Sequence, residues 1–147
     1  MRNDGPTRSG LPLLIRLARQ TADERRGELA RAQVLVAELR EALAGHERQV
    51  EAEGRAAADG PGARAAYPGW VMRAARRRAE LATGLDRAER EEARRRDALG
   101  EAFAAAKRLE LAAGAAEAAA ARSAARRAQA VAEEQAALGR AADAENT

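Results

Sequence analysis

Apolar side chains recur along the chain at steps that alternate between four and three residues. The first such stripe runs from Leu11 to Val50, with Arg25 and His46 as its polar members. Its positions are Leu11, Ile15, Ala18, Ala22, Arg25, Leu29, Ala32, Val36, Leu39, Leu43, His46 and Val50. This spacing keeps the side chains on one face of a helix and is typical of coiled coils. The pattern predicts a first helix over about residues 10–57.

A second stripe follows a break that is rich in Gly and Pro. Residues 59–69 read DGPGARAAYPG, and both residue types disfavour a helix interior, so we expect a turn over residues 58–69. The second stripe consists of Leu81, Leu85, Ala88, Glu92, Arg95, Leu99, Ala102, Ala106, Leu109 and Ala113. After about Ala116 it becomes almost entirely Ala, and its larger members there are Val131 and Leu138. The pattern predicts a second helix over about residues 70–142.

The two predicted helices differ in length, and this difference determines the expected architecture. We predict an all-α fold, an antiparallel two-helix coiled-coil hairpin over residues 11–142 with a longer second helix overhanging. Pairing residues 11–57 with residues 70–116 leaves about 25 residues of the second helix without a partner in the chain. A single Ala-rich helix is marginal when nothing packs on it, so this overhang should fray or insert into another molecule. Residues 1–10 are expected to form a disordered tail and residues 143–147 a frayed end.

The composition agrees with long helices rather than with a thick core. Hydrophobic residues make up 46% of the sequence, but most of them are Ala, which removes little surface from water on burial. Charged residues make up 33%, with both signs interspersed and a net charge of +3, which gives little support to nucleic-acid binding. The lack of Cys excludes disulfides, thiol catalysis and Cys metal sites, and no apolar run is long enough to span a membrane.

Residues that could carry catalysis or bind a metal are few and isolated. His46 is the single His, and a metal or catalytic site would need further ligands or a nucleophile beside it. Carboxylate pairs such as Glu91–Glu92 and Glu133–Glu134 lie on helices that offer no cleft to desolvate them. We therefore expect a protein that is not an enzyme, with no catalytic residue, cofactor, metal ion or small-molecule ligand.

Polar residues within the two stripes are expected to fix how the helices align. Isolated polar residues in a coiled-coil seam commonly set its register at some cost in stability. The predicted pairing across the seam is Arg25 with Glu101, Glu92 and Arg95 with Ala32 and Val36, and His46 with Glu80 and Leu81. The runs Arg76–Arg78 and Arg94–Arg96 point in different directions around a helix, so we interpret them mainly as solvated faces. Binding to anionic lipid or nucleic acid is the alternative interpretation of these runs.

Two of the three aromatic residues, Tyr67 and Trp70, flank the second Pro of the break. The predicted fold places them at the closed end of the hairpin. One interpretation is structural, in which Trp70 covers the last residues of the seam. The other is a binding knob, because exposed Trp and Tyr are strong anchors of protein interfaces. The two roles are compatible, and both stay open.

Together these features resemble the flagellar export protein FliJ and its injectisome relatives. The resemblance rests on three segments: the run LPLLIRLARQTADERRGELARAQ with its Leu29–Gln33 cluster, Trp70 opening the second helix, and the late run AFAAAKRLELAAGAAEAAAARS. It extends over about residues 11–142. The chain departs from it most at Ala113–Ala121, where family members often carry more Lys, Glu and large apolar residues.

The resemblance implies a non-enzymatic coiled-coil component of the type III protein export apparatus, similar in shape to the central stalk of rotary ATP synthases. Its implied location is the cytoplasm, associated peripherally with the inner-membrane export apparatus through partners. Those partners are the export ATPase ring and its regulator, the membrane protein of the export gate, and export chaperones. By location, the ring-end candidates are Leu11, Leu14, Ile15, Val131 and Leu138, and the candidates at the hairpin tip are Tyr67, Trp70 and Met72.

Two other interpretations stay open. The first is a structural coiled-coil scaffold, or a protein resembling the peripheral stalk of an ATPase, in which the overhang pairs with another copy. The second is a basic helical hairpin that binds nucleic acid, with an affinity that falls steeply as salt rises. All but one of the 26 basic residues are Arg, and no aromatic residues are interleaved with them, which argues against the second.

Overall fold

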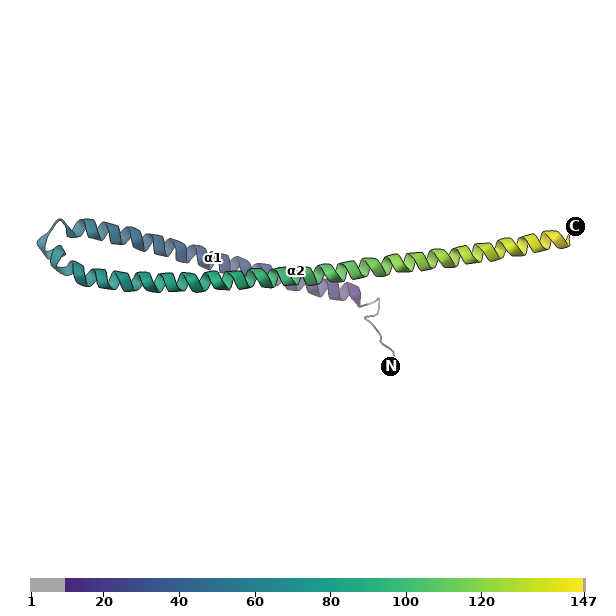
Figure 1. Ribbon diagram of the computed structural model, residues 1–147, viewed down its shortest axis with the longest axis horizontal. Coiled ribbons are helices and arrows are strands. Elements are labelled where there is room, and N and C mark those ends of the chain that lie inside the picture. The colour runs from purple at the N-terminus through teal and green to yellow at the C-terminus, as the bar shows by residue number, and fades with distance from the viewer. Residues whose placement is uncertain (1–9, 147) are drawn as a thin grey trace, which may run out of the picture. The chain divides into compact units, whose positions relative to one another are not determined.

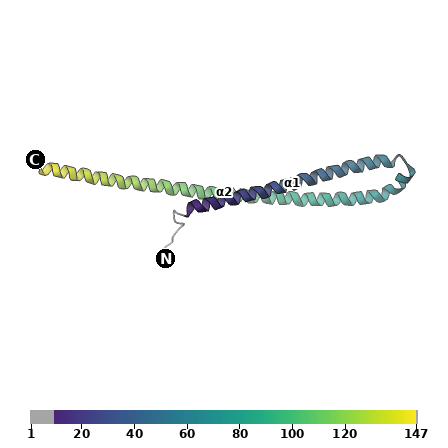
Figure 2. The same ribbon diagram turned by 180° about the vertical axis from the view of Figure 1, so that it is seen from behind.

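The computed structural model describes residues 10–146 and contains two helices, α1 (Leu11–Ala57) and α2 (Pro61–Glu145) (Figure 1). No strand occurs among these residues, and the two helices pack against each other, which confirms the predicted all-helical fold. The chain divides into two compact units. The central unit is Gln20–Phe103, and the terminal unit combines Met1–Arg19 with Ala104–Thr147. In the central unit α1 and α2 lie side by side in both views (Figures 1 and 2).

The predicted stripes are the faces along which the two helices meet. Every stripe position from Leu11 to Val50 and from Leu81 to Ala113 is buried or half-buried. The buried apolar residues of the described chain are Ala22, Val36, Ala57, Ala74, Leu81, Ala88 and Ala106. Most of these are Ala, and the half-buried members of the two stripes include Leu, Ile and Val, so the helices meet along a narrow seam rather than around a core. Its hydrophobic stabilisation per residue is correspondingly small.

The turn is shorter than predicted, and the prediction of a turn over residues 58–69 is wrong. It covers residues 58–60, because α2 begins at Pro61 rather than near residue 70. Proline is well suited to the first position of a helix, where its missing N–H would have no partner. The carbonyl of Gly60 accepts the first helical hydrogen bond, from the Arg64 N–H at 3.0 Å. Pro68 lies inside α2, so the helix continues past it without one backbone hydrogen bond.

The structure tests the prediction for the C-terminal end of the chain but not the prediction for most of the N-terminal tail. The tail predicted over residues 1–10 lies, except for Gly10, outside the described residues. At the other end α2 continues to Glu145, beyond the predicted limit near residue 142 and into the end predicted to fray. Half-burial along α2 persists to Ser123, and residues 124–146, here called the uncovered end, are all exposed.

Within the described part of the chain, neither helix contains a stretch that is both long and apolar enough to cross a lipid bilayer.

The narrow seam makes the cost of removing one buried side chain measurable. We expect Val36→Ala to lower the free energy of unfolding by about 1–3 kcal/mol, because it leaves a gap at a residue that is 2% exposed. Val34→Ala is the matched control, because Val34 lies two positions away on the same helix and is 57% exposed. Thermal unfolding followed by circular dichroism measures both. Equal effects of the two substitutions would contradict the observed seam.

Candidate functional site

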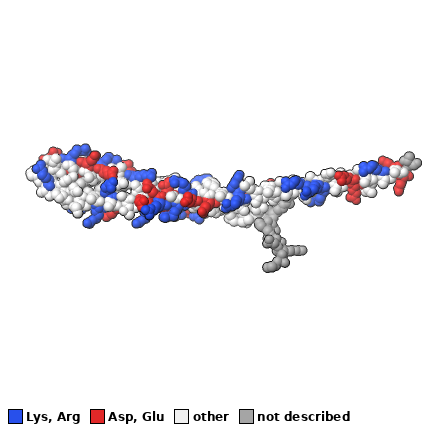
Figure 3. Space-filling view, in the orientation of Figure 1, with Lys and Arg blue, Asp and Glu red and all other residues white. Residues whose placement is uncertain are grey.

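Ion pairs between the helices show which turns of α1 and α2 lie opposite each other. In the central unit Arg40 pairs with Glu89 at 2.8 Å, and Glu47 pairs with Arg78 at 3.1 Å. In the terminal unit Arg19 Nη2 lies 2.8 Å from a carboxylate oxygen of Glu110. In the central unit the partner of the later α1 residue, Glu47, is the earlier α2 residue, Arg78. Such exposed pairs stabilise a fold only slightly. Figure 3 shows positive and negative groups interspersed over the visible surface.

A denser polar cluster crosses the seam of the central unit. Glu28 accepts hydrogen bonds from Arg25 on its own helix at 3.0 Å and from Arg95 on α2 at 2.9 Å. Arg95 Nε also lies 2.7 Å from Glu91. The hydrogen bond from Arg25 holds the pKa of Glu28 below its usual range against the opposing effect of desolvation, and the charge of Arg25 and the hydrogen bond from Arg95 add to the lowering. The pKa of Arg95 is raised, first by the negative charge of Glu91 and then by the hydrogen bond to Glu28.

One predicted pairing across the seam is wrong. The expected pairing of Arg25 with Glu101 stays a prediction, and Arg25 binds Glu28, which is three residues along the same helix and therefore within easy reach. His46 was expected near Glu80 and Leu81. Instead its Nε2 lies 2.9 Å from the carbonyl oxygen of Ala74, and since a carbonyl only accepts, Nε2 donates the hydrogen.

The cluster depends on Glu28, which the stripe analysis missed. Glu28 is not a stripe residue, and the available signal was the Arg–Glu spacing of three residues from Arg25. Arg95 was correctly expected to face Ala32, because both line the same hollow beside the cluster. The described residues contain no group of three or more His, Cys, Asp and Glu side chains placed to hold a metal ion.

Tyr67 and Trp70 pack on the closed end of the two helices. Their rings stack with centroids 6.0 Å apart and an interplanar angle of 15°, and both residues are half-buried. Gly54 of α1 permits this packing, because a Cβ at that position would lie 3.0 Å from the Tyr67 hydroxyl oxygen. A hollow of about 200 Å³ lies beside the stacked rings, lined by Glu53, Ala56, Ala57, Ala63, Ala66, Tyr67, Trp70 and Arg73. We call residues 53–73 the tip.

Met72, the third predicted tip residue, differs from the two aromatic residues. It is 72% exposed, and the neighbouring Val71 is 38% exposed. The structure therefore divides the predicted tip site into an aromatic pair that covers the helix ends and an apolar surface turned to solvent.

The predicted ring-end residues do not form one cluster. Leu11 and Ile15 are half-buried in the seam of the terminal unit, whereas Leu14 is 39% exposed. Val131 and Leu138 are 52% and 65% exposed on the uncovered end. They are seven residues apart and so lie on one face of α2. Sequence reasoning missed two further exposed apolar side chains beside Leu14, namely Leu13 and Leu17.

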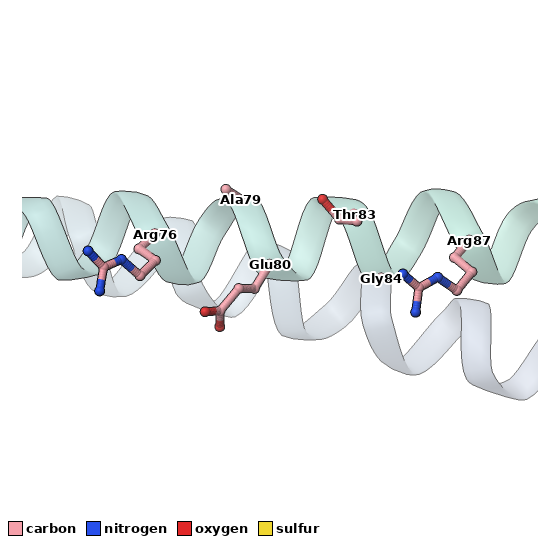
Figure 4. A pocket seen from close by; sticks show the side chains of 6 residues that line it. All are labelled: Arg76, Ala79, Glu80, Thr83, Gly84 and Arg87. Atoms are coloured by element: carbon pink, nitrogen blue, oxygen red, sulfur yellow. The ribbon is translucent and has the colours of Figure 1, made fainter.

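A further hollow lies on the outer surface of α2 and is drawn in Figure 4. Its lining comes from a single helix: Arg76, Ala79, Glu80, Thr83, Gly84 and Arg87. A hollow formed by side chains of one helix cannot enclose a substrate or exclude water from it.

Comparison with known proteins gives no relative for this chain. No protein-family model, no curated protein and no solved structure matches it. Its function must therefore be inferred from the residues and contacts described above.

The cluster predicts how acid affects stability. Because Glu28 has a lower pKa in the folded chain than in the unfolded chain, the unfolded chain takes up protons first as the pH falls. The stabilising contribution of the Glu28 carboxylate is present above about pH 4.3, and it is lost as the pH falls through the pKa that Glu28 has in the folded chain. Glu28→Gln should have a lower unfolding temperature than the wild type at pH 7. Below about pH 5 the unfolding temperature of the variant should fall less steeply than that of the wild type, as measured by circular dichroism. Glu51→Gln, at an exposed residue of the same helix, should keep the wild-type pH profile.

The aromatic pair predicts a difference within the tip. Trp70→Ala should destabilise the fold by about 1–2 kcal/mol, because it removes a half-buried ring and its stacking contact with Tyr67. Met72→Ala should leave the unfolding temperature nearly unchanged, because the side chain is exposed. If Trp70→Ala proved as neutral as Met72→Ala in thermal unfolding, the aromatic pair would have no structural role.

Proposed function

We propose that this chain is a non-enzymatic, stalk-like coiled-coil protein of a type III protein export apparatus, of the FliJ type. The observation that carries the proposal is the unequal length of its packed helices. α1 ends at Ala57 after 47 residues, whereas α2 has 85 residues and remains helical over an exposed end. A helix that extends beyond its partner is suited to entering another molecule.

The finer architecture in this proposal is an antiparallel coiled-coil hairpin with an overhanging second helix. The pairing of Arg40 with Glu89 and of Glu47 with Arg78 supports it, because residues farther along α1 meet residues earlier in α2. The buried stripes with their spacing of four and three residues support coiled-coil packing.

The uncovered end is the proposed segment for the export ATPase ring and its regulator. Its small side chains give a narrow helix with little steric resistance, and its charges alternate in sign, which disfavours a single locked position in a ring. Val131 and Leu138 are the proposed apolar contacts, together with Leu14 on α1, while Leu11 and Ile15 support α1 from within the seam.

Contacts with the export gate and with export chaperones are assigned to the remaining surfaces. Met72 is the proposed exposed contact at the tip, and Tyr67 and Trp70 hold the surface from which it projects. The protein would then work in the cytoplasm, at the periphery of the inner membrane.

A second candidate is a structural scaffold or a protein resembling an ATPase peripheral stalk. The observation that favours it is the apolar stripe of the uncovered end, where Val131 and Leu138 recur with heptad spacing and could pair with a second copy. Size-exclusion chromatography with light scattering separates the candidates. A monomer supports the export stalk, and a tight dimer supports the scaffold.

The export role predicts that binding to the ATPase depends on the uncovered end. Val131→Glu with Leu138→Glu should weaken co-purification with an export ATPase by at least about tenfold, because two apolar contacts become charged. Val34→Glu, at a residue similarly exposed on α1, is the control and should bind normally. Unchanged binding by the double variant, with its unfolding temperature also unchanged, would remove this surface from the proposal.

A further inference from the structure

The first turns of α2 carry an unusual concentration of positive charge. Residues 61–79, PGARAAYPGWVMRAARRRA, contain five Arg and no Asp or Glu. No other interval between consecutive acidic residues of the sequence holds as many basic residues. The interspersed charge of the rest of the chain is therefore interrupted at this one place.

Part of this charge has no acidic partner. Arg78 pairs with Glu47 and Arg77 with Glu80, but Arg73 and Arg76 have no carboxylate partner among the residues that the structure describes. Both side chains are exposed, and each lines a hollow that is open to solvent. Two guanidinium groups are thus available to an anion outside the protein.

An apolar stripe lies beside these Arg residues on the outer side of α2. The side that meets α1 carries Tyr67, Ala74 and Leu81, each seven residues from the next and each half-buried or buried. Met72 lies two positions before Ala74 and therefore about 200° around the helix from it. The outer stripe is entirely exposed and consists of Pro61, Ala65, Pro68, Met72, Ala75 and Ala79. Figure 3 shows white and blue atoms along the lower edge of its left-hand end, where α2 begins.

We propose that this outer face of α2, residues 61–79, binds an anionic lipid surface directly. The helix lies along the bilayer, with Met72 and the adjacent Val71 turned to the acyl chains. Arg76 and Arg73 follow Met72 at about 40° and 100° around the helix, and they bind lipid phosphates along that side of the stripe. An exposed apolar stripe flanked by basic residues is the pattern of helices that lie in a membrane interface.

The composition of the face also determines what the binding requires. Only Met72 and Val71 are large apolar residues, so insertion alone is too weak to hold the protein. Each basic residue near an anionic leaflet strengthens binding about fivefold. Binding therefore needs both signals and should be absent on neutral lipid. A nucleic acid would use the Arg residues but would gain nothing from Met72, so the lipid surface accounts for more of the face.

The test is co-sedimentation of the full-length protein with vesicles at low and at moderate salt. Vesicles of phosphatidylcholine with phosphatidylglycerol should bind the protein, and vesicles of phosphatidylcholine alone should not. Arg73→Gln with Arg76→Gln should weaken binding about 30-fold, because two basic residues are lost. Arg122→Gln with Arg126→Gln removes the same charge from exposed positions elsewhere on α2 and should change binding less than about twofold. Met72→Glu should abolish binding, while Val34→Glu should not.

Circular dichroism of each variant separates loss of the face from loss of the fold. The proposal is overturned if neutral vesicles bind equally well, or if the control pair weakens binding as much as Arg73→Gln with Arg76→Gln. It is also overturned if no vesicle binds while a DNA duplex binds at the same salt and tolerates Met72→Glu. Because no export component is present in this assay, its result does not depend on the proposed export role.

Discussion

The narrow seam between α1 and α2 is the interaction on which the rest of the structure depends. Most of its buried residues are Ala, and each Ala buries little surface. Stability must therefore accumulate along the length of the contact, and it ends where the contact ends. α2 continues beyond that point as a helix, and residues 124–146 are all exposed.

A heptad repeat leaves the alignment of two helices weakly determined. After a slip of one heptad most apolar positions would again meet apolar positions, so the spacing alone does not select a single register. The contact between Glu28 and Arg95 does favour one register, because it joins the two helices, while Arg25 and Glu91 bind these two side chains from their own helices. Polar residues in coiled coils are well known to specify register at a cost in stability.

The heptad spacing predicted the two helices and their contact faces, because one periodicity determines both. It did not predict where α2 begins, because Pro61 and Pro68 were taken as breaks, whereas Pro61 is suited to a first helical position. It also missed the partners of Arg25 and His46. Spacing defines a face of a helix, but the length of the turn decides which residues of the other helix lie opposite. Glu28, Leu13 and Leu17 were missed for another reason, since they lie outside the stripes.

The proposed functions use the surfaces that the seam leaves free, namely the uncovered end and the outer face of the first turns of α2. Hydrogen–deuterium exchange of the isolated protein at low concentration tests the underlying claim most directly, because amide protection reports where a helix is packed. The account predicts slow exchange over residues 81–113 of α2 and markedly faster exchange over residues 124–146. Equal protection of both segments would show that the end of α2 is packed within the isolated molecule, and would contradict the account.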